Sequence, residues 1–365
     1  MSEWQNVTLK QLVKFGNGKS RPKEKGKIPV YGGNGILDFT DKYNYAGETL
    51  IIGRVGAYCG ATYLEKSPVW VSDNALSAKA LDNNNPDYLY YLFKYLDLNQ
   101  YAQGSSHPLL TQTLLNAIEV ETTLDGIEQK AIASVLSSLD DKINLLHRQN
   151  KTLEAMAETL FRQWFVEKAQ NYWQSGILKD EFNFIMGQSP KGSSFNEENI
   201  GTPMFQGNAD FGFRFPKERV YTTEPTRFAQ KFDTLISVRA PVGAQNMSRG
   251  KCCIGRGVSA FRHAKFSEWY TYTYFKLRYL MNEIKKFNDE GTVFGSISKS
   301  DFEKIEVIIP PDEIVHEFEL ITKPINDKVI KNSFQIETLE KLRDTLLPKL
   351  MSGEVRVKYT PEAEQ

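Results

Sequence analysis

The sequence predicts an α+β fold in which two pseudo-two-fold-related α/β domains are separated by an antiparallel coiled coil of two long helices. Three observations predict it. One segment is repeated at a constant offset, each half has short strands followed by an aromatic helix, and each half closes with a long helix. A chain that repeats one domain-plus-helix unit is expected to build two similar halves.

The repeat is clearest where GSSHPLLTQTLLNAIEV, starting at Gly104, is matched by GTVFGSISKSDFEKIEV, starting at Gly291, 187 positions later. Val55-Gly56-Ala57 is matched by Val242-Gly243-Ala244 at the same offset. Two copies of about 185 residues indicate a tandem duplication, because solenoids need three or more short units. The predicted division is a first domain at 1–124, a long helix at 125–170, a second domain at 171–311, a long helix at 312–353 and a tail at 354–365.

Short strands broken by Gly and Asn turns are predicted in both copies. They lie at 28–35, 49–53 and 68–72 in the first copy, and at 202–208, 234–238 and 257–261 in the second. Helices rich in Tyr and Phe follow at 87–98 and 269–287. These aromatic side chains could stack on bases, but at helical spacing they are more typical of a core.

Several helices carry a start signal. Ser298 with Asp301 three residues later fits a capping box, and Thr111 occupies the matching position in the first copy. Asn85-Pro86-Asp87-Tyr88 resembles the Asn-Pro-Pro-aromatic motif of amino-methyltransferases, but it lacks the second proline and a cofactor-binding glycine loop. It is therefore interpreted as the start of a helix.

The long helices have coiled-coil spacing, with steps that alternate between four and three in the first helix. Asn150 is the polar residue of the first seam, and a single buried Asn commonly fixes register. Because domain and helix alternate along the chain, the second helix is expected to return along the first. The predicted seam, which also serves partners, contains Leu139, Ile143, Leu146, Asn150, Leu153, Leu160, Trp164, Ile336, Leu339, Leu346 and Leu350.

Composition sets the broad class of protein. Forty-five basic residues balance 45 acidic ones, so any basic surface must be local, as in the Lys-rich stretch from Lys10 to Lys27. No apolar run is long enough to cross a membrane and no secretory signal is present, which predicts a cytoplasmic protein. Cys59, Cys252 and Cys253 are expected to be reduced and buried.

Catalytic motifs are missing from the sequence. We find no phosphate-binding loop, no HExxH, no Cys/His cluster for a metal and no nuclease-type carboxylate pattern. The chain is expected to recognise a partner, with no catalytic or metal site of its own.

Nearly the whole chain resembles the specificity subunit of type I restriction–modification enzymes. The resemblance is strongest in Gln129–Ile143 with Leu160–Phe165, and in LRDTLLPKLMSGE from Leu342. The loops that begin at Gly104 and Gly291 resemble the turns that close each target-recognition domain of that family. The resemblance implies that each domain reads one half of a bipartite, asymmetric site in double-stranded DNA.

The resemblance also implies partners. The helices would dock two methyltransferase (modification) subunits of a DNA adenine methyltransferase, and restriction/translocase subunits would complete a complex for defence against foreign DNA. The chain would bind no cofactor, since S-adenosylmethionine, ATP and Mg²⁺ belong to the partner subunits.

Candidate DNA contacts follow from residue chemistry and position in the repeat. Arg54 and Arg239 lie in matching strand–turn segments and are candidates for guanine contacts, although either could instead pair with a carboxylate inside its domain. Loop residues could contact phosphates, and those near the repeated glycines could equally cap helices. Beyond the two arginines, the candidates are Lys19, Ser20, Arg21, Asn34, Ser105, Ser106, His107, Gln112, Lys191, Ser193, Ser194, Gln206, Asn208, Thr292, Ser296 and Lys299.

Two other functions remain open from the sequence. A coiled-coil adaptor without DNA specificity explains the helices but gives the duplicated glycine-rich domains no role. A self-contained enzyme requires motifs that the sequence lacks.

Overall fold

The computed structural model describes residues 3–104, 108–286 and 295–358. It divides into two compact units, one formed by Met1–Asn144 with Glu337–Gln365 and the other by Leu145–Ile336. Each long helix starts in one unit and ends in the other, so a unit contains one α/β domain and a part of both helices. The boundaries predicted for the domains remain a prediction.

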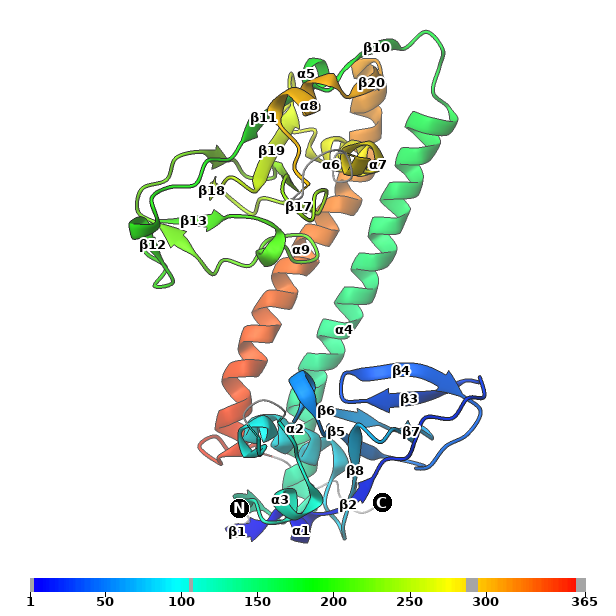
Figure 1. Cartoon of the computed structure of the whole chain (residues 1–365), viewed down its shortest axis with the longest axis vertical. Coiled ribbons are helices and arrows are strands. Elements are labelled where there is room, and N and C mark those ends of the chain that lie inside the picture. The colour runs from blue at the N-terminus through cyan, green and yellow to red at the C-terminus, as the bar shows by residue number, and fades with distance from the viewer. Residues whose placement is uncertain (1–2, 105–107, 287–294, 359–365) are drawn as a thin grey trace. The chain divides into compact units, whose positions relative to one another are not determined.

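Unit 1 is built on a four-stranded sheet in the order β2-β8-β5-β6 (Figure 1). A three-stranded sheet has the order β4-β3-β7, and β1 pairs with β9. The elements are β1 (Trp4–Thr8), α1 (Leu9–Leu12), β2 (Val13–Asn17), β3 (Ile28–Gly32), β4 (Gly35–Thr40), β5 (Thr49–Gly53), β6 (Thr62–Glu65), β7 (Trp70–Val71), β8 (Ala75–Ala80), α2 (Pro86–Leu96), α3 (Gln112–Asn116) and β9 (Glu119–Thr123).

The aromatic helix α2 lies in the core of unit 1, as predicted. Tyr88 and Phe93 are buried with Phe15 of β2 and the sheet residues Leu50 and Ile52. Asn85 is the N-cap of α2, accepting a hydrogen bond from the Tyr88 amide at 2.9 Å. The interpretation of this motif as a helix start is confirmed.

Unit 2 repeats this architecture. Its four-stranded sheet has the order β11-β19-β16-β17, which matches β2-β8-β5-β6 position for position, and β10 pairs with β20 as β1 pairs with β9. The elements are β10 (Gln174–Ile177), α5 (Leu178–Glu181), β11 (Phe182–Met186), β12 (Phe195–Asn196), β13 (Thr202–Phe205), β14 (Tyr221–Thr222), β15 (Phe228–Ala229), β16 (Thr234–Ser237), β17 (Gln245–Met247), β18 (Cys252–Ile254), β19 (Val258–His263), α6 (Tyr270–Tyr279), α7 (Met281–Lys286), α8 (Lys299–Lys304) and β20 (Glu306–Ile309).

The second aromatic helix, α6, is also a core helix. Tyr272, Tyr274 and Phe275 are almost fully buried. Cys59, Cys252 and Cys253 are free and buried, as the sequence predicts. The described helices include none that is both long and apolar enough to span a bilayer.

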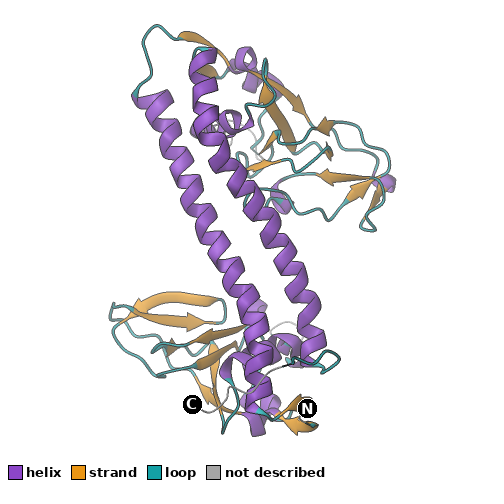
Figure 2. Cartoon of the chain, turned by 180° about the vertical axis from the view of Figure 1, so that it is seen from behind, coloured by secondary structure: helices purple, strands orange, loops and turns teal. Residues whose placement is uncertain are grey.

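The long helices α4 (Gly126–Arg162) and α9 (Asp312–Met351) are the two long purple ribbons of Figure 2, and the colours of Figure 1 show that they run antiparallel within each unit. In unit 1, Arg356 just beyond α9 pairs with Glu128, and Arg343 pairs with Asp140. Residue numbers thus increase along α4 in the direction in which they decrease along α9, so the two helices are antiparallel. In unit 2, Asn150 contacts Ser333 and Phe161 packs on Phe318, with the same sense.

The predicted seam residues are buried or partly buried, and none is exposed. Asn150 and its counterpart on α9, Asn332, have no exposed surface. Their side-chain nitrogens lie 3.4 Å from Ser333 and Gln149, but neither side-chain oxygen accepts a hydrogen bond from a described residue. Such half-satisfied polar groups cost stability, and they favour the register that brings them opposite polar partners.

A buried arginine attaches the domain of unit 2 to α4. Arg214 lies in the loop before β14, its side chain has no exposed surface, and its guanidinium lies 4.1 Å from the Tyr274 ring. Glu154 of α4 accepts from Arg214 and from Arg278, each at 3.1 Å. The next loop residue, Phe215, stacks on Phe334 of α9 at 4.9 Å. The loop is therefore fixed to both helices.

Removing the charge of Glu154 should destabilise unit 2 strongly. Glu154→Gln leaves the Arg214 cation buried without its counter-charge, and we expect a loss of about 2–4 kcal/mol in the free energy of unfolding. Glu158→Gln is a matched control one turn along, because Glu158 is 49% exposed and lies 3.8 Å from Arg278. We expect that change to cost under about 0.5 kcal/mol. Urea unfolding of both variants is the measurement, and equal losses would contradict the role given to Glu154.

Candidate nucleic-acid interface

Five backbone segments of each domain meet at one edge of its sheets. In the first domain, Lys19 donates to Val71 and Ser72 donates to Tyr31. Arg54 donates to Asn74 and accepts from Leu110. This ladder joins the loop after β2, the end of β3, the turn after β5, the turn before β8 and the segment before α3. We call the meeting point the turn edge.

The second domain has the same ladder. Gln188 donates to Ile254, and Gly255 donates to Phe205. Val238 donates to Gly257 and accepts from Ile297. Because each bond has a counterpart in the first domain, the ladder aligns the two copies residue by residue at the turn edge.

The alignment corrects the repeat derived from the sequence. Gly60 donates to Gly53 as Gly243 donates to Ser237, and both glycines have positive φ, 87° and 86°. Gly243-Ala244 therefore corresponds to Gly60-Ala61, and the match to Gly56-Ala57 is wrong. Arg54 and Arg239 do lie in corresponding segments, but Arg54 corresponds to Val238, and the counterpart of Arg239 is Val55.

The turn edge of the second domain contains a hollow of about 300 Å³. Arg239 and Arg256 line it, and both side chains are exposed. Neither forms an ion pair with a described residue, whereas Arg219 and Arg262 are paired with carboxylates. The hollow therefore holds two guanidinium groups whose charge is not balanced by a carboxylate of the described residues.

Gln206 also lines this hollow, and a hydrogen bond orients its side chain. Its side-chain oxygen accepts from the Ser189 hydroxyl at 2.7 Å, and that hydroxyl also accepts from the Arg256 amide at 3.2 Å. A Cβ on Gly255 would lie 2.3 Å from the same side-chain oxygen, and one on Gly257 would lie 2.2 Å from the Gln206 carbonyl. Gly257 is thus required for the close approach of the Gln206 main chain, and a side chain at Gly255 would displace the Gln206 amide. The bond from Ser189 leaves the amide nitrogen of Gln206 as a donor.

Comparison with known proteins identifies the family. Residues 1–155 and 171–336 match the family described as the type I restriction modification DNA specificity domain. The chain belongs to this family.

Relatives support the assignment over most of the chain. A putative type I restriction enzyme MjaX specificity subunit of Methanocaldococcus jannaschii is 31% identical over 293 residues, covering 75% of this chain and 69% of the relative. The MjaIX specificity subunit of the same organism is 28% identical, covering 85% and 78%. The crystal structure of an S subunit from M. genitalium has the same fold, with a TM-score of 0.71, 21% identity and 96% coverage of both chains.

The turn edges of this specificity-family member hold some of the sequence-predicted residues. Gln206 and Arg239 lie in the hollow, and Ser296 pairs with Arg239 through an isolated backbone bridge. Ser189 and Arg256 were missed, as was Asp73 of the first domain. The glycines that flank Arg256 are a signal that could have drawn attention to it.

Other predicted residues lie at or near these edges with varied exposure. Lys19, Ser20, Arg21, Asn34, Lys191 and Ser193 are exposed, and Asn208 and Gln112 are partly buried. Arg54 is partly buried, and its Nε is buried without a hydrogen-bond partner among the described residues. Lys299 is exposed and lies 3.6 Å from Glu303. Ser105, Ser106, His107 and Thr292 lie outside the described residues.

Ser194 does not fit the phosphate contact predicted for it. Its side chain is buried, and its hydroxyl donates to the Lys191 carbonyl at 2.7 Å. A second hydroxyl, that of Thr222, lies 2.7 Å away. The physical reason is that Ser194 closes its own turn, so its proton is already used.

The helix caps predicted at Thr111 and Ser298, beside the repeated glycines, are confirmed. Thr111 accepts from the Leu114 amide at 3.2 Å. Ser298 accepts from the Asp301 amide, and the Asp301 carboxylate accepts from the Ser298 amide at 2.8 Å. The hydroxyl groups of Thr111 and Ser298 therefore have a structural role that needs no DNA.

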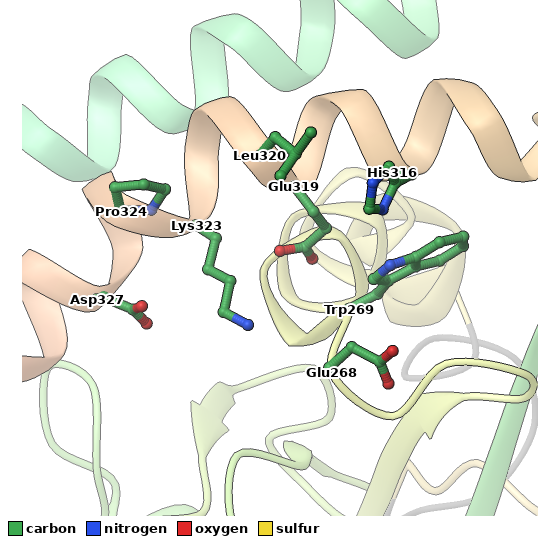
Figure 3. Close-up of a pocket in the computed structure, with 8 residues that line it drawn as sticks. All are labelled: Glu268, Trp269, His316, Glu319, Leu320, Lys323, Pro324 and Asp327. Carbon is green, nitrogen blue, oxygen red and sulfur yellow. The ribbon is translucent and has the colours of Figure 1, made fainter.

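A second hollow in unit 2, of about 290 Å³, contains none of the predicted DNA-contact residues. Figure 3 shows the Glu319 carboxylate between Lys323 and Trp269. Glu319 is only 4% exposed and accepts from the Tyr272 amide at 2.7 Å, so it caps the start of α6 from a different helix. Burial raises the pKa of Glu319 to about 7, against the lowering effect of that hydrogen bond.

This pKa predicts how pH affects the stability of unit 2. The folded state keeps the Glu319 proton up to about pH 7, whereas the unfolded state releases it near pH 4.5. Stability is therefore lost as pH rises through that window. Glu319→Gln keeps an acceptor for Tyr272 without the charge, so it should raise the free energy of unfolding at pH 8 by about 1–3 kcal/mol and change it little at pH 4.5.

Thermal or urea unfolding at the two pH values measures the effect. Glu317→Gln is the control, because Glu317 is exposed on the same helix and the charge change is identical. A stabilisation by Glu319→Gln that is the same at both pH values would show that titration of this carboxyl is not its cause.

Proposed function

We propose that this chain is the DNA sequence-recognition subunit of a type I restriction–modification complex. Each α/β domain reads one half of a bipartite, asymmetric site in double-stranded DNA. Family membership over both domains supports the role, and the repeated turn edge is the observation that carries the two-part site. Two copies of one ladder provide two equivalent surfaces, and an asymmetric site requires them to differ in their side chains.

The chemistry of the turn edges suits DNA. Sequence is read by donors and acceptors that face base edges, while Lys, Arg and hydroxyl groups near phosphates position the protein. The second domain offers Arg239, Arg256 and Gln206, and the first offers Asn34 and Asp73, with Lys19 and Arg21 beside them. The adaptor alternative, which gives these groups no partner, is not favoured.

The helices are proposed to dock two methyltransferase subunits, with restriction/translocase subunits completing the complex. Apolar side chains that stay exposed on α4 and α9 support this role, because such residues are normally covered in a complex. They are Ile127, Leu145, Met156, Leu320, Ile321 and Leu342.

Catalysis is assigned to the partners. The described residues contain no group of three or more His, Cys, Asp or Glu side chains placed to hold a metal ion. Adenine methylation with S-adenosylmethionine, and ATP- and Mg²⁺-dependent cleavage, would take place on the partner subunits in the cytoplasm. This chain would supply only the choice of site.

Exchange of a domain tests the proposal. Replacing residues 1–124 with the corresponding segment of another family member should change one half of the methylated site and leave the other half intact. The measurement is sequencing of methylated adenines in cells that hold this subunit and its methyltransferase subunits. A change in both halves would contradict independent reading by the two domains.

A binding measurement separates the DNA role from an adaptor role. An electrophoretic shift assay is run with the chain alone and with the methyltransferase subunit added. DNA binding that appears or tightens with the partner supports the proposal. A complex that assembles but shows no preference for one DNA sequence over another would support the adaptor.

A further inference from the structure

Aligned by the backbone ladder, the two turn edges differ most where the second domain has its hollow. Arg239 corresponds to Val55, because both form the backbone bridge to the segment before the short helix, at Ser296 and Leu109. Arg256 corresponds to Asp73, because Arg256 follows Gly255, which donates to Phe205, and Asp73 follows Ser72, which donates to Tyr31. The second domain therefore has two cations where the first has an apolar side chain and an anion.

The two domains also differ at the position of Gln206. Phe205 accepts from Gly255 as Tyr31 accepts from Ser72, so the next residue, Gln206, corresponds to Gly32. The first domain has no side chain at that place, whereas the second has an amide fixed by Ser189. At the three aligned positions, the second domain thus presents two guanidinium groups and a side-chain amide, and the first presents the exposed carboxylate of Asp73.

We propose that Arg239 and Arg256, with Gln206 in the same hollow, read a guanine in the half-site of the second domain. The proposal rests on the DNA-recognition function and assigns it to particular residues. Guanine presents two acceptors, O6 and N7, in the major groove, and a guanidinium can donate to both. The first domain, with Asp73 and Val55 at these positions, cannot read the same base and is suited to a base that presents an amino group, such as cytosine.

The geometry favours a base over a phosphate. Gln206 is held by the Ser189 hydroxyl and lies against Gly255 and Gly257, and the Ser189 hydroxyl also accepts from the backbone of Arg256. Preorganised groups of this kind discriminate between ligands, whereas a contact that only neutralises phosphate charge does not need a fixed side-chain orientation. Phe195 adds an apolar wall to the same hollow.

The test imports the chemistry of the first domain into the second. Arg256→Asp and Arg239→Val are made in the full chain and assembled with its methyltransferase subunits. Each should lose selectivity for guanine at one base pair of the second half-site, with cognate affinity falling about 10- to 100-fold. The first half-site should stay unchanged, and its continued methylation shows that the variant is folded. Lys179→Asp, an exposed basic residue on α5, is the charge-change control and should leave the site unchanged.

Each outcome supports or contradicts a stated hypothesis. Uniform weakening on all sequences, with a shallower salt dependence, would mean that the arginines contact phosphates and would overturn the proposal. An unchanged second half-site would overturn it as well, while the recognition function would stand. A wild-type complex that methylates no two-part site would instead reject the recognition function, and this assignment with it.

Discussion

The buried charge of Arg214 is the constraint on which unit 2 depends. A guanidinium without exposed surface needs a counter-charge, and Glu154 of α4 supplies it. The loop that carries Arg214 cannot leave the helix without exposing or orphaning that charge, so the domain is held in one position on α4. Unit 1 has a related arrangement that is less buried. Asp140 of α4 accepts from Tyr91 of α2 at 2.9 Å and from Arg343 of α9 at 2.8 Å. In each unit a carboxylate of α4 connects the domain to the helices.

The repeated backbone separates two requirements that a reading domain must meet. Hydrogen bonds between main-chain atoms build the turn edge, so they can be the same in both copies whatever bases are read. The ladder itself is made of main-chain bonds, so side chains such as Arg256 and Asp73 are free to differ between the copies. Glycine is needed where a neighbouring group comes close, as at Gly257 beside Gln206, or where φ is positive, as at Gly60 and Gly243. Specificity can therefore change with little effect on the fold.

The sequence was sufficient for features that depend on local pattern. Helical spacing predicted α4 and α9 to within a few residues at the starts, and the first long helix continues beyond Arg162 as a π-helix to Glu167, short of the predicted end at 170. The caps at Thr111 and Ser298 were predictable because both partners lie within three residues. The family could be predicted because its helices carry long, specific stretches. These are all properties of short segments or of periodicity.

The turn edge could not be predicted because its bonds join segments far apart in the sequence. The offset between corresponding residues changes from segment to segment, and the identical Val-Gly-Ala triplets obscured one of these changes. Only the backbone pairing shows that Gly243 corresponds to Gly60 in the other copy, and that Arg239 corresponds to Val55. Similarly, nothing local marks Arg214 as buried or Arg256 as unpaired, since both are arginines in glycine- or phenylalanine-containing loops. Their roles depend on where carboxylates lie in space.

Zero net charge adds a last consequence for how the chain can bind DNA. Non-specific affinity comes mainly from phosphate neutralisation, and a chain with 45 acidic and 45 basic residues gains little from a long-range field. Much of the basic charge in the second domain is also cancelled internally, as at Arg214, Arg219 and Arg262. What remains at the turn edge is a small set of donors that can distinguish bases but can neutralise few phosphates. Under the proposed function, a chain built in this way would supply discrimination, and its partner subunits would supply most of the affinity.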